Sequence, residues 1–321
     1  MNELTLQDVR DALARIQPHI TRTPVLTSAR LDELSGCRLF FKCENFQKTG
    51  AFKARGATNA VLSLTAEQAA RGVATHSSGN HAAALARAAA LRGIPAYVVM
   101  PRTASAFKVA AVERYGGEII FCEPTHAARE AAASLIVRET GACLVHPFND
   151  PRVIAGQATA ALELLGQAPD LDVVFSPVGG GGLLAGTALV VSALRPGARV
   201  FGGEPEGAAD TARSLEAGTR TPVDRPASVA DGLLAFVGDL TFPIIREKVS
   251  GVVTVSEAEI LRAMMLLIEV MKIAIEPSGA VGYAALSKRS SDFKGLRVGV
   301  ILSGGNMDLA GIPWASSRPA P

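Results

Sequence analysis

The feature that most constrains the fold of this chain is an alternation of short β-branched or aromatic runs with alanine-rich stretches. Runs such as "GVATHS" (72–77), "PAYVVM" (95–100) and "EIIFCE" (118–123) predict strands, and "NHAAALARAAALRG" between the first two predicts a helix. Strand–helix units repeated along a chain favour a doubly wound parallel sheet. The chain is therefore expected to be an α/β protein.

The alternation covers most of the 321 residues and resumes after residue 150. Further strands are predicted over 38–44, 143–147, 172–178, 199–204 and 297–305. Ser256 and Glu259 form a capping box, which predicts a long helix that ends near Lys272. We expect two lobes in one compact unit, a large domain over residues 1–70 and 149–321 and a small one over residues 71–148.

Charge and composition argue against several classes of function. A net charge of +2 gives no electrostatic reason to bind nucleic acid or an anionic membrane. The N-terminal stretch "MNELTLQDVRDALARIQPHI" reads as an amphipathic helix with acidic residues rather than a signal peptide, and no apolar run reaches transmembrane length. Four cysteines without a CxxC spacing are expected to be buried free thiols of a reducing compartment. We therefore expect a cytoplasmic protein with no nucleic-acid or membrane partner.

A glycine-rich turn follows a predicted strand in "DVVFSPVGGGGLLAG". Backbone N–H groups of this turn and the positive end of the next helix can bind a phosphate. No Lys-Ser/Thr pair follows the glycines, which disfavours a nucleoside-triphosphatase loop. A dinucleotide site stays open, because Gly180, Gly182 and Ala185 satisfy G-x-G-x-x-G/A and Glu204 ends the next predicted strand. A turn used only for packing is the third interpretation.

Three other polar segments lie at predicted strand ends or helix starts. They are Lys53 in "ENFQKTGAFKARG", the turn 77–81 in "THSSGNHAA", and Ser303 in "ILSGGN". Each alone is consistent with an ordinary turn or helix cap. Ligands of open α/β sheets lie beyond the carboxyl ends of the strands, so together these segments predict one shared crevice.

An ordered set of motifs carries a resemblance to a known family. The chain contains "FFKCENFQKTGAFKARGA", "THSSGNHA", "VGGGGLLAG", "EPEGAAD", "VADG", "MKIAIEPSGAVG" and "LSGGNMDLA" between residues 39 and 310. This set resembles the fold-type II pyridoxal-phosphate enzymes: serine and threonine dehydratases, serine racemases and threo-3-hydroxyaspartate dehydratases. The resemblance implies a tryptophan-synthase-β-like fold of two doubly wound parallel-sheet lobes, with pyridoxal 5'-phosphate in the crevice between them. It further implies a large cofactor-binding domain, a small mobile domain that grips the substrate, and a homodimer.

The resemblance also implies roles for individual residues. Those assigned to the cofactor are Phe52, Lys53, Asn80, Gly179, Gly180, Gly181, Gly182, Leu183 and Ser303. Those assigned to the amino-acid substrate are Ser77, Ser78, Asn80, His81 and Arg129. In this assignment Lys53 is the Schiff-base lysine, the glycines hold the phosphate, Phe52 and Asn80 flank the ring and its 3-hydroxyl, and Ser303 faces the pyridine nitrogen.

The chemistry of these side chains supports the assignment. An amine forms an imine only when it is neutral, so Lys53 needs a buried site that lowers its pKa, and once freed it can remove the α-proton. A hydroxyl at Ser303, rather than a carboxylate, leaves the pyridine nitrogen largely unprotonated, which favours β-elimination over transamination. Lys48 lacks this context and is expected to be an exposed loop charge.

A second site is predicted in "FGGEPEGAAD". The carboxylates of Glu204 and Asp210 and the carbonyl of Ala208 are hard oxygen ligands, suited to Mg²⁺ or to Ca²⁺ or Mn²⁺. Members of the resembled family carry a divalent cation at this motif. Two solvated loop carboxylates are the alternative interpretation.

Two residues bear on the choice of activity. Ser78 takes the position that serine racemases use for proton transfer on the cofactor face opposite Lys53, but it also suits a dehydratase as a helix cap. Arg129 is either a cation for a second substrate carboxylate or a solvated helix charge. We predict an ammonia-lyase that converts L-serine- or L-threonine-type 3-hydroxy amino acids to 2-oxo acids. Serine racemase and threo-3-hydroxyaspartate dehydratase are close alternatives, and an NAD-dependent oxidoreductase is a remote one.

Overall fold

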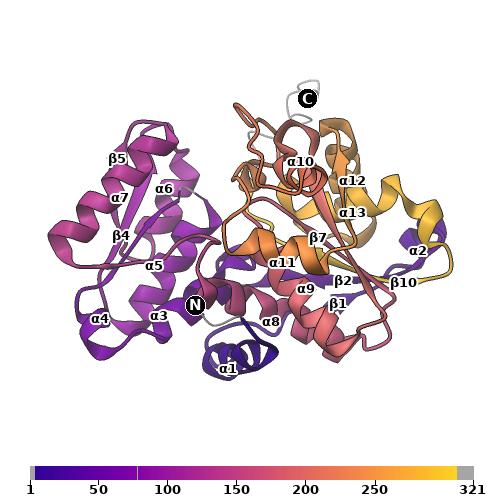
Figure 1. The fold of residues 1–321 in the computed structure, drawn as a ribbon, viewed down its shortest axis with the longest axis horizontal. Coiled ribbons are helices and arrows are strands. Elements are labelled where there is room, and N and C mark those ends of the chain that lie inside the picture. The colour runs from indigo at the N-terminus through magenta and orange to yellow at the C-terminus, as the bar shows by residue number, and fades with distance from the viewer. Residues whose placement is uncertain (1–3, 78, 309–321) are drawn as a thin grey trace, which may run out of the picture.

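A computed structural model of the chain describes residues 4–77 and 79–308. Figure 1 shows two lobes, each built around its own sheet. The predicted arrangement of two parallel-sheet lobes is confirmed, with one antiparallel strand as the exception.

The large lobe contains a six-stranded sheet. In spatial order its strands are β1 (Val25–Leu26), β2 (Arg38–Cys43), β10 (Arg297–Leu302), β7 (Val173–Pro177), β8 (Arg199–Pro205) and β9 (Gly251–Val255). All neighbours are parallel except β1 and β2. Strands β1 and β9 were not predicted, because β1 is only two residues long and β9 follows an irregular stretch rich in proline and glycine.

The small lobe contains a four-stranded parallel sheet. Its strands in spatial order are β5 (Glu118–Cys122), β4 (Ala96–Pro101), β3 (Val73–His76) and β6 (Cys143–Leu144). The four strands follow one another along a single stretch of chain. The first sheet, in contrast, takes its strands from both sides of that stretch.

Helices cover both sheets. They are α1 (Leu6–Ile16), α2 (Ala29–Ser35), α3 (Lys53–Leu62), α4 (Ala66–Ala70), α5 (Asn80–Arg92), α6 (Ala106–Glu113), α7 (His126–Thr140), α8 (Pro151–Gln167), α9 (Gly182–Leu194), α10 (Asp210–Ala217), α11 (Thr241–Lys248), α12 (Glu257–Met271) and α13 (Pro277–Lys288). Short 3₁₀ turns are η1 (Glu44–Phe46), η2 (Lys48–Gly50), η3 (Glu206–Ala208), η4 (Asp231–Leu233) and η5 (Ser290–Phe293). The predicted capping box is confirmed: the Glu259 amide donates to Ser256 Oγ, and the Ser256 amide donates to Glu259 Oε2.

Apolar side chains fill both faces of the larger sheet, as expected for parallel strands. One cluster lies against α12 and α13, and the other lies against α8 and α9. In the small lobe, α5 buries a row of alanines, which lets it pack closely on the sheet and on α3. Helices α3 and α4 lie beside the small sheet in Figure 1, although both precede residue 71.

The four cysteines are free, as predicted, but only two of them are buried. Cys37 and Cys43 lie in the core of the large lobe, whereas Cys122 and Cys143 are half-buried. The reason is topological, because β5 and β6 form the two edges of the small sheet. No helix in the described part of the chain is both long and apolar enough to cross a bilayer.

Candidate active site

The segment that carries Lys53 is fixed to the end of β10. Ala51 forms a β-bridge with Gly304, and the Phe52 amide donates to the carbonyl of Ser303 at 2.9 Å. Lys53 is the first residue of α3, so this contact places it beside the C-terminal end of the sheet's central strands. The structure thus brings Lys53 and Ser303 together, as the sequence predicted.

The amine of Lys53 lies deep in the protein although its side chain keeps some exposed surface. Its Nζ donates to the carbonyl of Pro147 at 2.8 Å and lies 5.1 Å from the ring centroid of Phe52. Burial lowers the pKa of Lys53 to about 8. An appreciable fraction of the amine is therefore neutral near physiological pH, the state in which it can attack a carbonyl. Lys48 is exposed, as expected.

A buried cluster of charges anchors the helix that begins with Lys53. Arg55 donates to both carboxylate oxygens of Glu44, at 2.7 and 2.8 Å, and to both of Glu163, at 2.9 and 2.8 Å. Lys42 donates to Glu163 at 2.7 Å. Two cations and two carboxylates balance one another out of contact with water, and they join α3 to η1, β2 and α8. Sequence reasoning missed this cluster, since its members are far apart in the chain.

The start of α5, in the small lobe, contacts the large lobe near Ser303 and Gly304. Asn80 Nδ2 donates to Glu276 Oε1 at 2.8 Å, and Asn80 Oδ1 accepts from Asn306 Nδ2 at 2.9 Å. No atom lies within 4 Å of the position a Cβ would take on Gly79, so there is open space beside this turn. Ser77 Oγ accepts from the Gly79 amide at 3.4 Å. Ser78, the predicted second catalytic residue, lies outside the described residues.

His81 is buried and neutral. Its Nε2 lies 3.3 Å from the carbonyl of Val145, and its Nδ1 has no hydrogen-bond partner among the described residues. Burial, and then the charge of Lys53, lower the pKa of His81 well below its ordinary value. A neutral ring that donates through Nε2 leaves Nδ1 as an acceptor.

Glu276 is a member of the site that sequence reasoning missed. It is buried, its amide donates to the Gly304 carbonyl at 3.1 Å, and a Cβ on Gly304 would lie 2.3 Å from its Oε1. Burial and then the negative charge of Asp231 raise the pKa of Glu276 to about 8, against the hydrogen bond from Asn80, which lowers it. The available signal was an acid directly before Pro-Ser-Gly at a helix start, in "IEPSGAVG".

The glycine loop precedes α9 and is walled by other segments. A Cβ on Gly179 would lie 2.8 Å from Leu233 Cα, and one on Gly180 would lie 2.3 Å from the ring of Phe148. Gly181 has φ +89°, a conformation that favours glycine. Gly182 and Leu183 begin α9, whose first amides have no acceptors within the helix. The loop can therefore present N–H groups to an anion.

The predicted metal ligands are buried, which corrects the alternative of two solvated loop carboxylates. Glu204 accepts from two amides at the start of α10, at 2.8 and 2.9 Å, and Asp210 accepts from the Val237 amide at 2.8 Å. Burial raises the pKa of Glu204 to about 7 and that of Asp210 to about 6. Ala208, which lies between Glu204 and Asp210 in the sequence, is also buried. The buried hydroxyl of Thr211 has no hydrogen-bond partner among the described residues. Because Glu204 is enclosed and bonded to α10, it does not offer the exposed carboxylate that a ribose hydroxyl would need.

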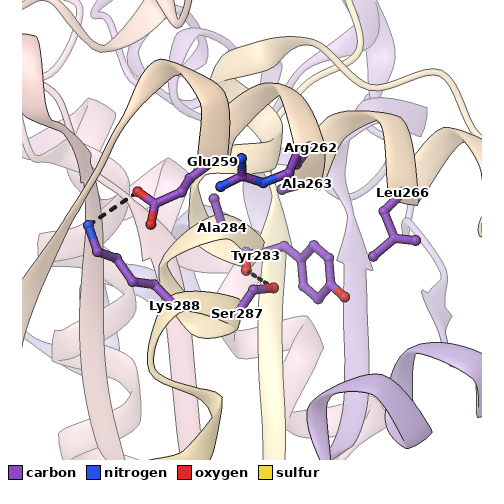
Figure 2. Close-up of a pocket in the computed structure, with 8 residues that line it drawn as sticks. All are labelled: Glu259, Arg262, Ala263, Leu266, Tyr283, Ala284, Ser287 and Lys288. Carbon is purple, nitrogen blue, oxygen red and sulfur yellow. Dashed lines mark hydrogen bonds and ion pairs between the residues drawn. The ribbon is translucent and has the colours of Figure 1, made fainter.

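Three further observations concern metal clusters, Arg129 and a hollow in the large lobe. No cluster of three or more His, Cys, Asp or Glu side chains suited to a metal occurs in the ranges described. Arg129 is half-buried on α7, and its Nε donates to the Thr125 carbonyl of its own helix at 3.4 Å. A hollow of about 330 Å³ lies between α12 and α13. Lys288 and Glu259, which form an ion pair at 3.2 Å, are among the lining residues labelled in Figure 2. None of the residues that line the hollow belongs to the predicted site.

Comparisons with known proteins match nearly the whole chain. A family model described as pyridoxal-phosphate dependent enzyme matches residues 16–304. Beta-hydroxyaspartate dehydratase of Paracoccus denitrificans (strain Pd 1222) is 54% identical over 310 residues, covering 97% of this chain and 98% of that protein. Serine racemase of Arabidopsis thaliana is 51% identical over 317 residues, covering 97% and 95%. The structure of maize serine racemase is similar with a TM-score of 0.95 and 46% identity, over 98% of this chain and 97% of that one.

Proposed function

The chain belongs to the pyridoxal-phosphate dependent enzymes, and on that premise we propose that it is a hydroxy-amino-acid dehydratase, an ammonia-lyase. Its substrates are 3-hydroxy amino acids, which it converts to 2-oxo acids and ammonia by α-proton removal and β-elimination. The observation that carries the proposal is the amine of Lys53, which lies at the carboxyl end of the sheet and whose pKa burial lowers to about 8.

The residues present fit the cofactor. Lys53 supplies the neutral amine that an aldehyde requires, and the amides before α9 suit a phosphate. The open space beside Gly79 leaves room for a ligand between the two lobes. In this proposal Gly179 to Gly182 and Leu183 hold the phosphate, Phe52 and Asn80 flank the ring, and Ser303 faces the pyridine nitrogen.

When bound, pyridoxal phosphate supplies an electron sink for negative charge at the α-carbon of the amino acid. Lys53 Nζ accepts the α-proton, since a neutral amine held by the Pro147 carbonyl is available as a general base. Ser77 and Asn80, with the backbone N–H of His81 in the first turn of α5, bind the α-carboxylate. Glu276 and Asn306 orient the Asn80 amide, which keeps one N–H free to face the ring.

Ser303 favours elimination over transamination. A hydroxyl does not hold a proton on the pyridine nitrogen as a carboxylate would, so charge is withdrawn less strongly from the α-carbon. Loss of the β-hydroxyl then competes with reprotonation. Serine racemisation is a second candidate, because this chain is similar to serine racemases at 51% identity; in that case Ser78 would exchange a proton on the face opposite Lys53.

The first test of the function is whether the purified protein is coloured by a bound cofactor and whether borohydride fixes that cofactor to the protein. Reduction should attach the cofactor to Lys53, as mass spectrometry of the peptides would show. Lys53→Ala should abolish ammonia release from L-serine, L-threonine and threo-3-hydroxyaspartate, whereas Lys48→Ala should retain it. Turnover by Lys53→Ala, or a colourless protein that binds NAD instead, would contradict the proposal. An assay for D-serine distinguishes the racemase.

We also propose that Glu204, Asp210 and the Ala208 carbonyl bind a divalent cation, Mg²⁺ or alternatively Ca²⁺ or Mn²⁺. Two neighbouring buried carboxylates with raised pKa values support this, because a cation would compensate both charges. A chelator should lower the melting temperature and the activity, and Mg²⁺ should restore both. Asp210→Asn should remove the response to Mg²⁺. An unchanged melting temperature on chelation and on addition of Mg²⁺ would refute the site.

The remaining organisation is proposed by analogy with the family. We propose a cytoplasmic homodimer in which residues 71–148 form the small mobile domain and residues 1–70 and 149–321 form the large one. Light scattering of the purified protein tests the dimer. Limited proteolysis tests the boundaries, because cleavage should concentrate near residues 70 and 148 if the small domain moves as a unit.

A further inference from the structure

An ion pair joins the two lobes near the candidate site. Lys108, in the first turn of α6, donates through Nζ to Asp231 Oδ2 in the turn η4. Lys108 belongs to the lobe of the small sheet, and Asp231 belongs to the lobe of the large sheet. The Lys108 side chain is 32% exposed and that of Asp231 is 59% exposed, so the pair lies at the surface of the junction.

Two contacts and one electrostatic effect place this pair near the proposed cofactor site. The backbone of Leu233, in the same turn as Asp231, lies against the glycine loop, since a Cβ on Gly179 would be 2.8 Å from Leu233 Cα. The Gly232 amide donates to Ser278 Oγ at 3.0 Å, two residues after Glu276. Both charges act on Glu276, because Asp231 raises the pKa of that carboxyl and Lys108 lowers it. The pair is therefore near both the loop proposed to hold phosphate and the carboxyl bonded to Asn80.

The charges around the crevice matter for any substrate with two carboxylates. In the holoenzyme Lys53 is occupied by the proposed cofactor and His81 is neutral, so neither offers fixed positive charge to a distal carboxylate. Arg129 keeps its charge, with its Nε bonded to the Thr125 carbonyl, and is the cation against which Lys108 has to be tested. Asp231 would repel such a group. Lys108 offsets Asp231, and its ammonium has three N–H donors, of which the ion pair uses one. An exposed pair costs little to rearrange, so Lys108 can bond a second carboxylate without leaving Asp231.

We propose that Lys108 is a specificity-determining residue that receives the distal carboxylate of the substrate, so that the enzyme favours 3-hydroxy amino acids with a second carboxylate. The inference rests on the proposed function and narrows its substrate class. It assigns to α6 the role that the sequence interpretation gave to Arg129 on α7.

The test compares Lys108→Met with Lys108→Arg in the holoenzyme, with Arg129→Met in parallel. Lys108→Met should lower kcat/KM for threo-3-hydroxyaspartate about 10-fold or more, with a change below about 2-fold for L-serine. Lys108→Arg should stay near wild type because it keeps the charge. Raising the salt concentration should increase KM for the dicarboxylate in wild type and have little effect in Lys108→Met. An equal loss on both substrates, or a selective loss in Arg129→Met alone, would overturn the proposal.

A binding measurement keeps this inference separate from the proposed reaction. Calorimetry of the holoenzyme with succinate and with butyrate requires no turnover. Succinate should bind about 10-fold more weakly to Lys108→Met than to wild type, with butyrate unchanged. If wild type releases no ammonia from any hydroxy amino acid but shows this difference, the reaction is wrong and the role of Lys108 stands. Equal succinate binding by the two proteins refutes the role of Lys108 alone. Lys108 is a partly exposed helix residue, so its substitution should leave the fold intact.

Discussion

At the scale of single residues, the proposed site gathers an amine, an imidazole and a carboxyl whose pKa values burial shifts toward the uncharged form. Burial lowers the pKa of Lys53 to about 8, lowers that of His81 further, and raises that of Glu276 to about 8. Lys53 and Glu276 can therefore change their protonation states at small cost near pH 8, whereas His81 stays neutral there. Such matching of pKa to working pH is what proton transfer during catalysis needs.

Glu276 leads to a prediction for the pH dependence of stability. Its pKa is about 8 in the folded protein against 4.5 ordinarily, so folding takes up a proton between these values. The stability linked to this proton is present in full below the lower value and is lost as pH rises through the higher one. Glu276→Gln cannot ionise and should lose less stability as pH rises, with the difference growing by at most about 1.4 kcal/mol per pH unit. Urea unfolding across this range measures it, and parallel curves for the two proteins would contradict the raised pKa.

At the scale of elements, helices α3 and α8 approach so closely that only glycine fits between them. A Cβ on Gly156 would lie 2.6 Å from Gly56 Cα and 2.8 Å from the Arg55 carbonyl, and neither backbone atom can move freely. Gly156→Ala should destabilise the protein by about 1–3 kcal/mol and shift α3, which lowers kcat through Lys53. Thermal unfolding and kinetics measure both effects.

Gly166, on the same helix α8, is the matched control. No atom lies within 4 Å of the position its Cβ would take. Gly166→Ala should therefore stabilise the protein by about 0.5–1 kcal/mol through the higher helix propensity of alanine, and kcat should not change. Equal effects of the two substitutions would show that the contact between the helices does not limit the position of α3.

The buried charge cluster gives a second prediction for α3. Arg55→Met would leave Glu44 and Glu163 buried without a compensating cation other than Lys42, which should cost about 3–5 kcal/mol. Glu163→Gln in addition should recover part of that loss, because it removes one of the uncompensated charges. A double-mutant cycle by chemical denaturation gives the coupling, and additive losses would exclude a shared network.

The sequence predicted those parts of the structure that depend on neighbours in the chain. The alternation of strands and helices, the capping box at Ser256 and the placement of Lys53 beside Ser303 all follow from local patterns and the geometry of parallel sheets. The contacts of Glu276 with Asn80, and of Arg55 with Glu163, join segments about a hundred residues or more apart. No local pattern specifies such a pairing. Burial of the predicted metal ligands was missed for the same reason, since later segments of the chain cover them.

At the scale of the whole molecule, the proposed site lies where the two lobes meet, and the hollow between α12 and α13 in Figure 2 lies elsewhere. Cofactor binding should therefore slow amide exchange around residues 51–56, 77–82, 179–185 and 303–306. Residues 259–266 of α12 should exchange at the same rate with and without cofactor. Hydrogen–deuterium exchange of the apo- and holoenzyme measures this, and protection centred on α12 would move the site to the other hollow.

The chain leaves the large sheet for the small one before β3 and returns to the large sheet after β6, and it does so only once among the described strands. Lys53, Ser303 and the glycine loop all lie outside this stretch. A block from Gly72 to Val145 can accordingly be exchanged as one cassette with that of a homologous enzyme. Such a chimera would keep Lys53, Ser303 and the glycine loop of one parent and take Asn80, α5 and α6 from the other. Libraries of recombined enzymes could then vary substrate preference while the lysine stays untouched.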